Sequence, residues 1–231
     1  MRCVISKKPA NGLTRMEVLA VITVLALLAI ILPCGPGRRA KEKARQIQCL
    51  SNLRQVSVGF LSYALDHPND RAILIVPPTD TQSQALVGFF RSRSNEFKLP
   101  GILWCPADAM RERATNWTEL TTNHISYLLD ADISAAQTLT SLVQVSELEL
   151  HPERILSGDR NITGGVWSSN RLMVFSSASQ PKWDKGIHSA RGNLATLDGW
   201  VAQTTDQLLS NQFQKMLSSS PTNSNIRLAI P

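Results

Sequence analysis

The sequence predicts an α+β protein in which a long N-terminal helix packs on a C-terminal antiparallel β-sheet head. Two observations support this class. An apolar segment and then an amphipathic segment follow one another between residues 13 and 66. The rest of the chain has short apolar runs separated by turn residues, as paired strands do. The chain has 231 residues, 43 % of them hydrophobic, which is enough to bury one core of ordinary size.

We expect five segments along the chain. They are a leader at 1–12, a transmembrane and assembly helix at 13–33, a helix break at 34–37, an amphipathic helix at 38–66 and a globular head at 67–231. The 20 residues 13–32 would form about 30 Å of helix, which matches the hydrocarbon core of a bilayer. The sequence therefore predicts that the first half of the long helix spans a membrane.

Glu17 is the side chain that a simple membrane anchor does not explain. Between Glu17 and residue 32 the only polar side chain is Thr23. An ionisable group in lipid costs a few kcal/mol on insertion scales, so Glu17 needs a partner or a role. The plainer alternative is that Glu17 lies close enough to the helix start to reach the headgroups.

The order of these features resembles the N-terminus of a type IV prepilin or of a type II secretion pseudopilin. A basic leader ends in Gly12, Leu13 follows, and Glu17 comes four residues later at the start of a hydrophobic helix. The resemblance implies that a prepilin peptidase cuts between Gly12 and Leu13 and methylates the new amino group of Leu13. It also implies that Glu17 neutralises the charged N-terminus of a neighbouring subunit in a filament.

Other N-terminal signals fit less well. A secretory signal peptide needs small residues at a cleavage site after its apolar core, and residues 32–36 have no such pattern. A lipoprotein signal is disfavoured because proline, not a small residue, directly precedes Cys34. A plain signal anchor accounts for the apolar run and leaves Glu17 without a role.

The charge distribution gives two conflicting indications of orientation. The chain has 24 basic and 18 acidic residues, and loss of the leader with Arg2, Lys7 and Lys8 leaves 21 basic residues, a net +3. Five basic residues at 38–45 would place that side of the apolar segment in the cytoplasm by the positive-inside rule. The resemblance implies the opposite orientation, which we prefer because the cleavage motif is more specific. We do not expect nucleic acid as a partner.

Proline and glycine at 33–37 predict a kink or break, after which the helix resumes. Apolar side chains then recur at steps of three and four, which predicts one buried stripe. The stripe is Ala40, Ala44, Ile47, Leu50, Leu53, Phe60, Leu61 and Ala64. Turn residues at 66–70 end this helix.

The head is expected to contain short strands, a hairpin and a last helix. Strands are predicted at 72–76, 102–104, 154–157 and 172–175. Asp198 and Gly199 predict a two-residue hairpin turn, and Thr204 with Gln207 predicts the cap of the last helix. The expected buried stripe of that helix is Leu208, Leu209, Phe213, Met216 and Leu217.

The head also resembles a group of pseudopilin-like proteins with large globular heads. The matching residues lie at 40–55, 104–108, 126–127, 158–161 and 188–201, where His188 precedes Asp198 and Gly199 in a His-to-Asp-Gly signature. The resemblance covers nearly the whole chain and is weakest at 79–96 and after residue 210.

The candidates for chemistry in the head are His124, Asp159, His188 and Asp198. No nucleophile elbow, zinc-protease helix, phosphate loop or dinucleotide fingerprint is present in the sequence. We expect no catalytic residue and no cofactor, with His188 and Asp159 binding each other or fixing loops. Asp66, Asn69 and Asp70 are candidate calcium ligands, although their spacing favours a turn.

Cysteine usage leaves two alternatives open. Of four cysteines, Cys3 would leave with the leader and Cys34 lies at the end of the apolar segment. Cys49 and Cys105 are a candidate disulfide in an oxidising compartment, or else two buried thiols. A zinc site is disfavoured because no paired ligand motif accompanies them.

The expected function is that of a pilin-like subunit that assembles into a pseudopilus or pilus, for type II protein secretion, and not of an enzyme. Its expected partners are prepilin peptidase, other pilin or pseudopilin subunits, inner-membrane lipid and the secretion or pilus assembly machinery. We expect a single-pass protein of the bacterial inner membrane with a cytoplasmic N-terminus and an extracytoplasmic head. The alternatives are a monomeric membrane-anchored ligand-binding protein and a membrane-bound hydrolase that uses His188 or Asp198.

Overall fold

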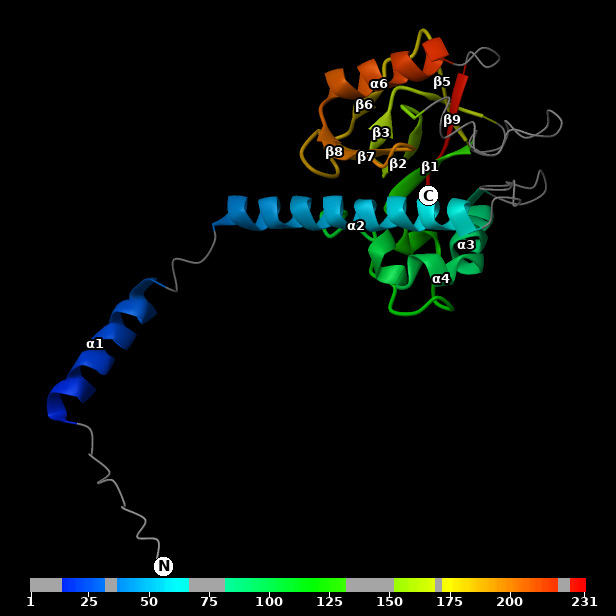
Figure 1. Ribbon diagram of the computed structural model, residues 1–231. Helices are drawn as coiled ribbons and strands as arrows, with labels where there is room; N and C mark the ends of the chain where they lie inside the picture. Colours follow the sequence, from blue (N-terminus) through cyan, green and yellow to red (C-terminus); the bar gives the residue numbers. More distant parts are fainter. Residues whose placement is uncertain (1–13, 32–36, 67–81, 132–151, 169–171, 220–224) are drawn as a thin grey trace, which may run out of the picture. The chain divides into compact units, whose positions relative to one another are not determined.

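The computed structural model describes residues 14–31, 37–66, 82–131, 152–168, 172–219 and 225–231 (Figure 1). The chain divides into two compact units, Met1–Lys41 and Glu42–Pro231. The predicted leader, the bond between Gly12 and Leu13, and the predicted strand at 72–76 lie outside the described residues.

A long helix that is only kinked is wrong, because the structure has two helices here, and the second has the bounds predicted for the helix that follows the break at 34–37. Helix α1 is Arg15–Ile31 and helix α2 is Arg38–Asp66. The 17 residues of α1 rise about 26 Å, less than the roughly 30 Å of a bilayer core. Among the described residues, no helix combines the length and the apolar character that crossing a membrane requires, so the expected membrane-spanning half is also wrong. The intervening sequence contains Pro33 and Pro36, and proline does not continue a helix.

The predicted stripe of α2 is confirmed only in part: Leu53 and Phe60 are buried, whereas Ala40, Ala44 and Ile47 are exposed. Cys49, Leu53, Val56 and Phe60 are buried and follow one another at steps of four, three and four, which places them on one side of the helix. Ile47, which was predicted to be buried, is 60 % exposed. The apolar pattern contained two partial stripes, and the sequence alone does not say which of them meets the sheet.

Seven strands form an antiparallel sheet in the order β4-β5-β9-β1-β2-β7-β8. The strands are β1 (Tyr127–Asp130), β2 (Ile155–Asp159), β4 (Val166–Trp167), β5 (Met173–Ser176), β7 (Gly192–Thr196), β8 (Val201–Thr204) and β9 (Asn225–Ala229). A second antiparallel pair joins β3 (Ile162–Thr163) to β6 (Lys182–Trp183). Strand β9 comes last in the chain and lies between β5 and β1.

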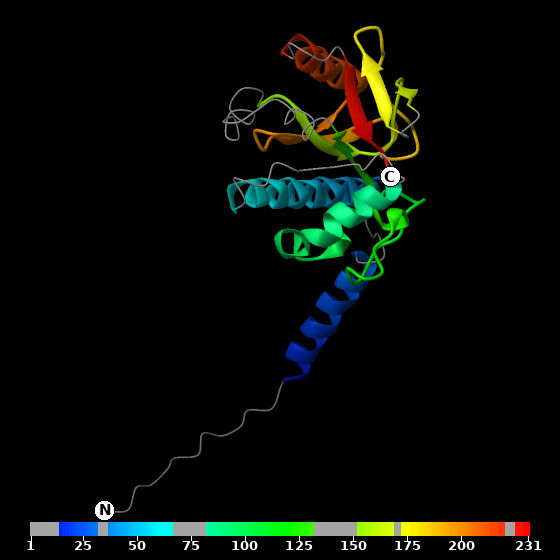
Figure 2. The same ribbon diagram turned by 90° about the vertical axis from the view of Figure 1, so that its right-hand side faces the viewer.

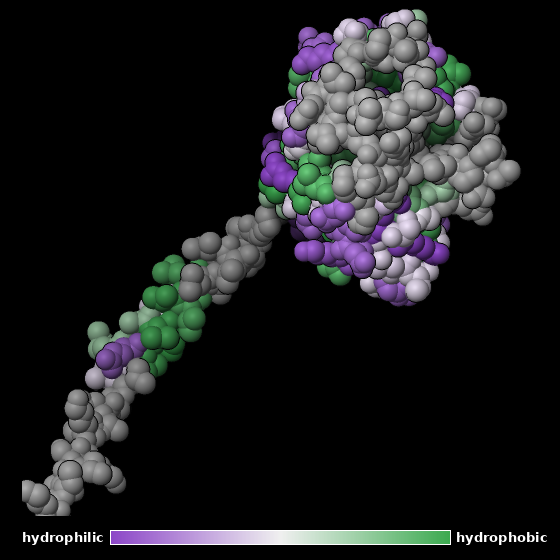
Figure 3. Space-filling model, turned by 45° about the vertical axis from the view of Figure 1, so that its right-hand side comes forward, coloured by the Kyte–Doolittle hydropathy of each residue, from purple (hydrophilic) through white to green (hydrophobic). Residues whose placement is uncertain are grey.

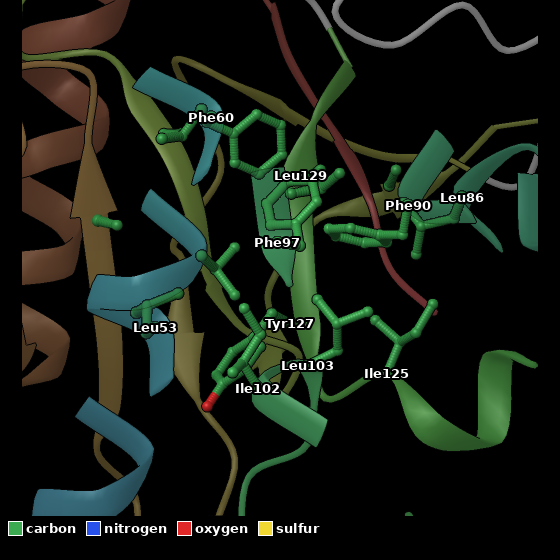
Figure 4. Packing of buried hydrophobic residues seen from close by; sticks show 14 of the residues in the cluster. Leu53, Phe60, Leu86, Phe90, Phe97, Ile102, Leu103, Ile125, Tyr127 and Leu129 are labelled. Atoms are coloured by element: carbon green, nitrogen blue, oxygen red, sulfur yellow. The ribbon is translucent and has the colours of Figure 1, made fainter. Parts of the chain in front are cut away.

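Both faces of the sheet are covered by helices (Figures 1 and 2). On one face, Leu128 and Leu194 share a buried cluster with Phe213 of helix α6 (Asp206–Ser219). On the other face, Tyr127 and Leu129 share a cluster with residues of α2 (Figure 4). Neighbouring residues of one strand therefore point into different cores, which is why these strands are apolar without a simple alternation.

Short helices complete the layer beside α2. They are α3 (Gln82–Ser92), α4 (Ser94–Phe97), and the 3₁₀ turns η1 (Pro100–Leu103) and η2 (Thr122–His124). The strand predicted at 102–104 is wrong because most of it lies in η1, where Pro100 occupies the first turn and fixes a helical φ. Four phenylalanines from α2, α3 and α4 pack with ring centroids between 5.1 and 6.4 Å apart.

The predicted hairpin between β7 and β8 is confirmed, with a loop one residue longer than expected. The Thr196 N–H donates to the Trp200 carbonyl, and Gly199 has φ +83°, a conformation that favours glycine. In α6, Leu209, Phe213 and Met216 are buried as predicted. Leu208 is 51 % exposed, because it lies one residue off that face.

Replacing Gly164 by alanine is expected to lower the free energy of unfolding by about 2 kcal/mol. Gly164 has φ +95°, and a Cβ atom there would overlap the Gln180 carbonyl oxygen. The matched control is Gly88→Ala in α3, where an added Cβ meets nothing within 4 Å and alanine should stabilise the helix by about 0.5–1 kcal/mol. Urea unfolding of the full chain in mild detergent, followed by tryptophan fluorescence, measures both. Equal effects of the two substitutions would contradict this role of Gly164.

Candidate functional site

Thr14 and Glu17 form hydrogen bonds with each other at the start of α1. The Glu17 carboxylate accepts hydrogen bonds from the Thr14 N–H at 2.8 Å and the Thr14 hydroxyl at 3.0 Å. In return, the Glu17 N–H donates to Thr14 Oγ1 at 3.3 Å. This reciprocal pair is a capping box, which satisfies backbone donors that a helix start leaves unpaired. Glu17 therefore has a local structural role that the sequence analysis missed, although the Thr-x-x-Glu spacing was visible.

After Glu17 the sequence of α1 is apolar except for Thr23, and Figure 3 shows hydrophobic colouring on the visible face of this helix. Its exposed fractions lie between 43 and 61 % at Val18, Leu19, Val21, Ile22, Val24, Leu25 and Leu27. The hydrogen bond from the Thr14 N–H lowers the pKa of Glu17, so the carboxylate is ionised at neutral pH. The arrangement thus places the Glu17 carboxylate, two residues after the basic Arg15, at the beginning of a helix that needs an apolar environment.

A second candidate lies in the head, where five side chains form what we call the buried polar cluster: Cys49, Cys105, Asp159, His188 and Asn193. Cys49 comes from α2, and Cys105 follows η1 by two residues. Asp159 ends β2, and Asn193 lies in the neighbouring strand β7. Cys49 and Cys105 form a disulfide in the structure, the first of the two alternatives that the sequence left open.

The loop before β7 brings His188 to this cluster. His188, Ser189 and Ala190 all have positive φ, between 54° and 62°, a conformation that costs about 1–2 kcal/mol for each non-glycine residue. Asn161 holds the loop, because its side-chain amide donates to the carbonyls of Asp184, Ile187 and Arg191 at 2.8 to 3.2 Å. Strain of this kind is common at functional sites and persists where surrounding contacts enforce it.

His188 Nε2 is the centre of the cluster. It lies 3.4 Å from Cys105 Sγ, 3.2 Å from Asn193 Nδ2 and 3.4 Å from Asp159 Oδ2. Asp159 Oδ2 also accepts the Asn193 N–H at 2.7 Å. The predicted contact between Asp159 and His188 is therefore confirmed. Asn193 and Asn161 were missed, because nothing in their local sequence distinguishes them from loop or strand asparagines.

Burial determines the charges in this cluster. Burial raises the pKa of Asp159 to about 8, a shift that the hydrogen bond from the Asn193 N–H opposes. Burial also lowers the pKa of His188 to about 4. Although the contact has the geometry of an ion pair, burial favours the uncharged form of both the Asp159 carboxyl and the His188 imidazole. Two sulfurs, an imidazole and a carboxyl group thus meet in one buried place.

The other candidate residues lie apart from this cluster. Asp198 is in the exposed hairpin loop, where it accepts hydrogen bonds from the Thr196 hydroxyl and the Trp200 N–H. His188 and Asp198 are thus beyond opposite ends of β7 and do not form one site. His124 belongs to η2, where its ring forms a capping box with Thr121.

The calcium hypothesis is not tested, because Asn69 and Asp70 lie outside the described residues and only Asp66, the last residue of α2, is described. No family model, curated protein or solved structure matches the chain. The function is therefore inferred from the residues and their geometry alone.

Proposed function

We propose that the chain is a pilin-like subunit that assembles through α1 into a pseudopilus or pilus for type II protein secretion. A prepilin peptidase would cut between Gly12 and Leu13 and methylate Leu13. The head would lie on the extracytoplasmic side of the bacterial inner membrane, and the chain would act mechanically and not as an enzyme. The observation that carries the proposal is the Glu17 carboxylate at the start of a helix whose exposed side chains after Glu17 are apolar except for Thr23.

Burial of α1 against copies of itself supplies the driving force for assembly. In a filament outside the bilayer, apolar surface contributes roughly 25 cal/mol for each Å² kept from water, so α1 helices would pack against one another there. Such packing would bury Glu17 as well, and a buried charge without a partner costs several kcal/mol. In the proposed filament, the partner of the Glu17 carboxylate would be the positively charged amino group of Leu13 in a neighbouring subunit. A carboxylate has about four acceptor sites, so the Thr14 contacts leave capacity for that amine.

Glu17 substitutions separate the charge-pairing role from the capping role. Glu17→Gln keeps an acceptor for the capping box but removes the charge, and Thr14→Ala removes the cap while keeping the charge. We expect both Glu17→Gln and Glu17→Ala to abolish filaments, and Thr14→Ala to assemble at near wild-type levels. Filaments are measured in the sheared fraction of cells, and mass spectrometry of the N-terminal residue shows whether each variant is cleaved.

The opposite pattern would contradict the proposal. If Glu17→Gln assembles normally and Thr14→Ala does not, Glu17 is only a helix cap. If all variants remain monomeric like the wild type in crosslinking of living cells, with residues 1–12 still attached, the chain is an anchored monomer. That outcome would favour the ligand-binding alternative.

A further inference from the structure

We propose that reduction of the disulfide converts the buried polar cluster into a binding site for a thiophilic divalent cation, with zinc as the best match. Its ligands would be Cys49 Sγ, Cys105 Sγ, His188 Nε2 and a carboxylate oxygen of Asp159. This inference is independent of filament assembly. It concerns only the head, and its test does not depend on whether Glu17 has the proposed role in assembly.

Three of the four donor atoms already lie close enough together to surround a zinc ion, and the fourth ligand, Asp159, contacts one of them. The sulfurs of Cys49 and Cys105 and a ring nitrogen of His188 lie within 4.8 Å of one another. Zinc bond lengths of about 2.0–2.3 Å place neighbouring ligand atoms about 3.3–3.8 Å apart. His188 Nε2 is 3.4 Å from both Cys105 Sγ and Asp159 Oδ2. The two bonded sulfurs must move apart, and Asp159, which contacts His188 but is not part of the group of three, must turn toward them.

The cluster also contains buried polar atoms that lack a partner. Asp159 Oδ1 and His188 Nδ1 are buried and have no hydrogen-bond partner among the residues that the structure describes. A fully buried carboxylate oxygen without a partner is unfavourable, and coordination of a cation would satisfy that carboxyl group. The donor set of two sulfurs, one imidazole and one carboxylate is one that zinc prefers.

Zinc was not predicted from the sequence, because no two of these ligands form a closely spaced pair in the chain. Here the ligands come from positions 49, 105, 159 and 188, on α2, after η1, at the end of β2 and in the loop before β7. The strained turn at His188 is what brings the imidazole to the two sulfurs. Such a site has no local spacing motif.

The redox step balances with a dithiol as the reductant. Its two S–H groups supply two electrons and two protons and become a disulfide, while the bond between Cys49 and Cys105 breaks and two thiols form. Metal binding then releases the two thiol protons, and the proton that the buried Asp159 carboxyl holds, as the thiolates and the carboxylate coordinate. Oxidation of the two cysteines reverses both steps and expels the cation. The same residues are therefore either a covalent bridge or a metal site, never both.

Cobalt absorption tests the site directly. The full chain, in mild detergent, is reduced with a phosphine during refolding from urea and titrated with Co²⁺, whose thiolate charge-transfer and visible bands report sulfur ligation. We expect one Co²⁺ per reduced chain, displaced by Zn²⁺, and none in the oxidised chain. His188→Ala should weaken binding at least about tenfold, and Asp159→Asn should change the visible bands. His124→Ala is the matched histidine control and should bind as the wild type does.

Each variant is first shown by circular dichroism to have the oxidised fold, so that a failure to fold is not mistaken for a loss of ligands. The proposal is overturned if the reduced wild type keeps its secondary structure and shows no sulfur-to-cobalt band. It is also overturned if His188→Ala binds Co²⁺ as tightly as the wild type, since the cysteines alone would then account for binding. If the visible absorption bands of bound Co²⁺ are the same in Asp159→Asn as in the wild type, Asp159 is not a ligand.

Discussion

The variant Arg160→Met is expected to lose about 3 kcal/mol of its free energy of unfolding. Arg160 follows β2 and donates to both carboxylate oxygens of Asp108, from Nε at 2.7 Å and from Nη2 at 2.8 Å. The Asp108 side chain is only 1 % exposed, whereas that of Arg160 is 21 % exposed. Removal of the guanidinium therefore leaves a buried carboxylate without its cation, which costs more than the lost contact itself.

The double variant Asp108→Asn, Arg160→Met tests this explanation. Asp108 Oδ1 also accepts the Met110 N–H at 3.1 Å, and asparagine keeps an oxygen for that bond. If the penalty comes from an unpaired charge, the double variant should recover more than half of the stability that Arg160→Met loses. Urea unfolding of the full chain in detergent at pH 7 measures both. A double variant as unstable as Arg160→Met would mean that the loss comes from packing of the Arg160 side chain.

The parts of the fold that could be predicted are those whose signal is local. The hairpin between β7 and β8 has a turn sequence at Asp198 and Gly199, and α6 has a regular apolar stripe. Strand β9 has no such signal, because its partners β5 and β1 are distant in the chain. The 3₁₀ turn η1 was mistaken for a strand because its apolar residues are buried in both cases.

In the candidate sites too, only the features with a local sequence signal could be predicted. The capping box of Thr14 and Glu17 is a four-residue pattern and could have been recognised from the sequence. The meeting of His188 with the disulfide could not, because it depends on three consecutive left-handed residues and on Asn161 holding the loop. A sequence without glycine at those positions gives no indication of positive φ.

Loss of the bridge between Cys49 and Cys105 is expected to lower the free energy of unfolding by about 4 kcal/mol, the value for closing a loop of this length in the unfolded chain. The two cysteines are 56 residues apart. The bridge connects α2 to the segment after η1, and the adjacent Tyr127 hydroxyl ties α2 to β1 by donating to the Cys49 carbonyl. The native packing around Cys49 thus has a second contact that survives reduction, so the reduced chain should stay folded at low urea.

Two measurements isolate the bridge from the metal. The wild type is unfolded in urea with and without a phosphine reductant, in a chelator that removes any divalent cation. The variant Cys49→Ala, Cys105→Ala is unfolded in the same way and should be insensitive to the reductant. Because a cation that binds only the folded chain adds stability, zinc in place of the chelator should restore part of the loss in the reduced wild type and none in the alanine variant. A loss below about 1 kcal/mol on reduction would show that the unfolded chain keeps the two segments close without the bridge.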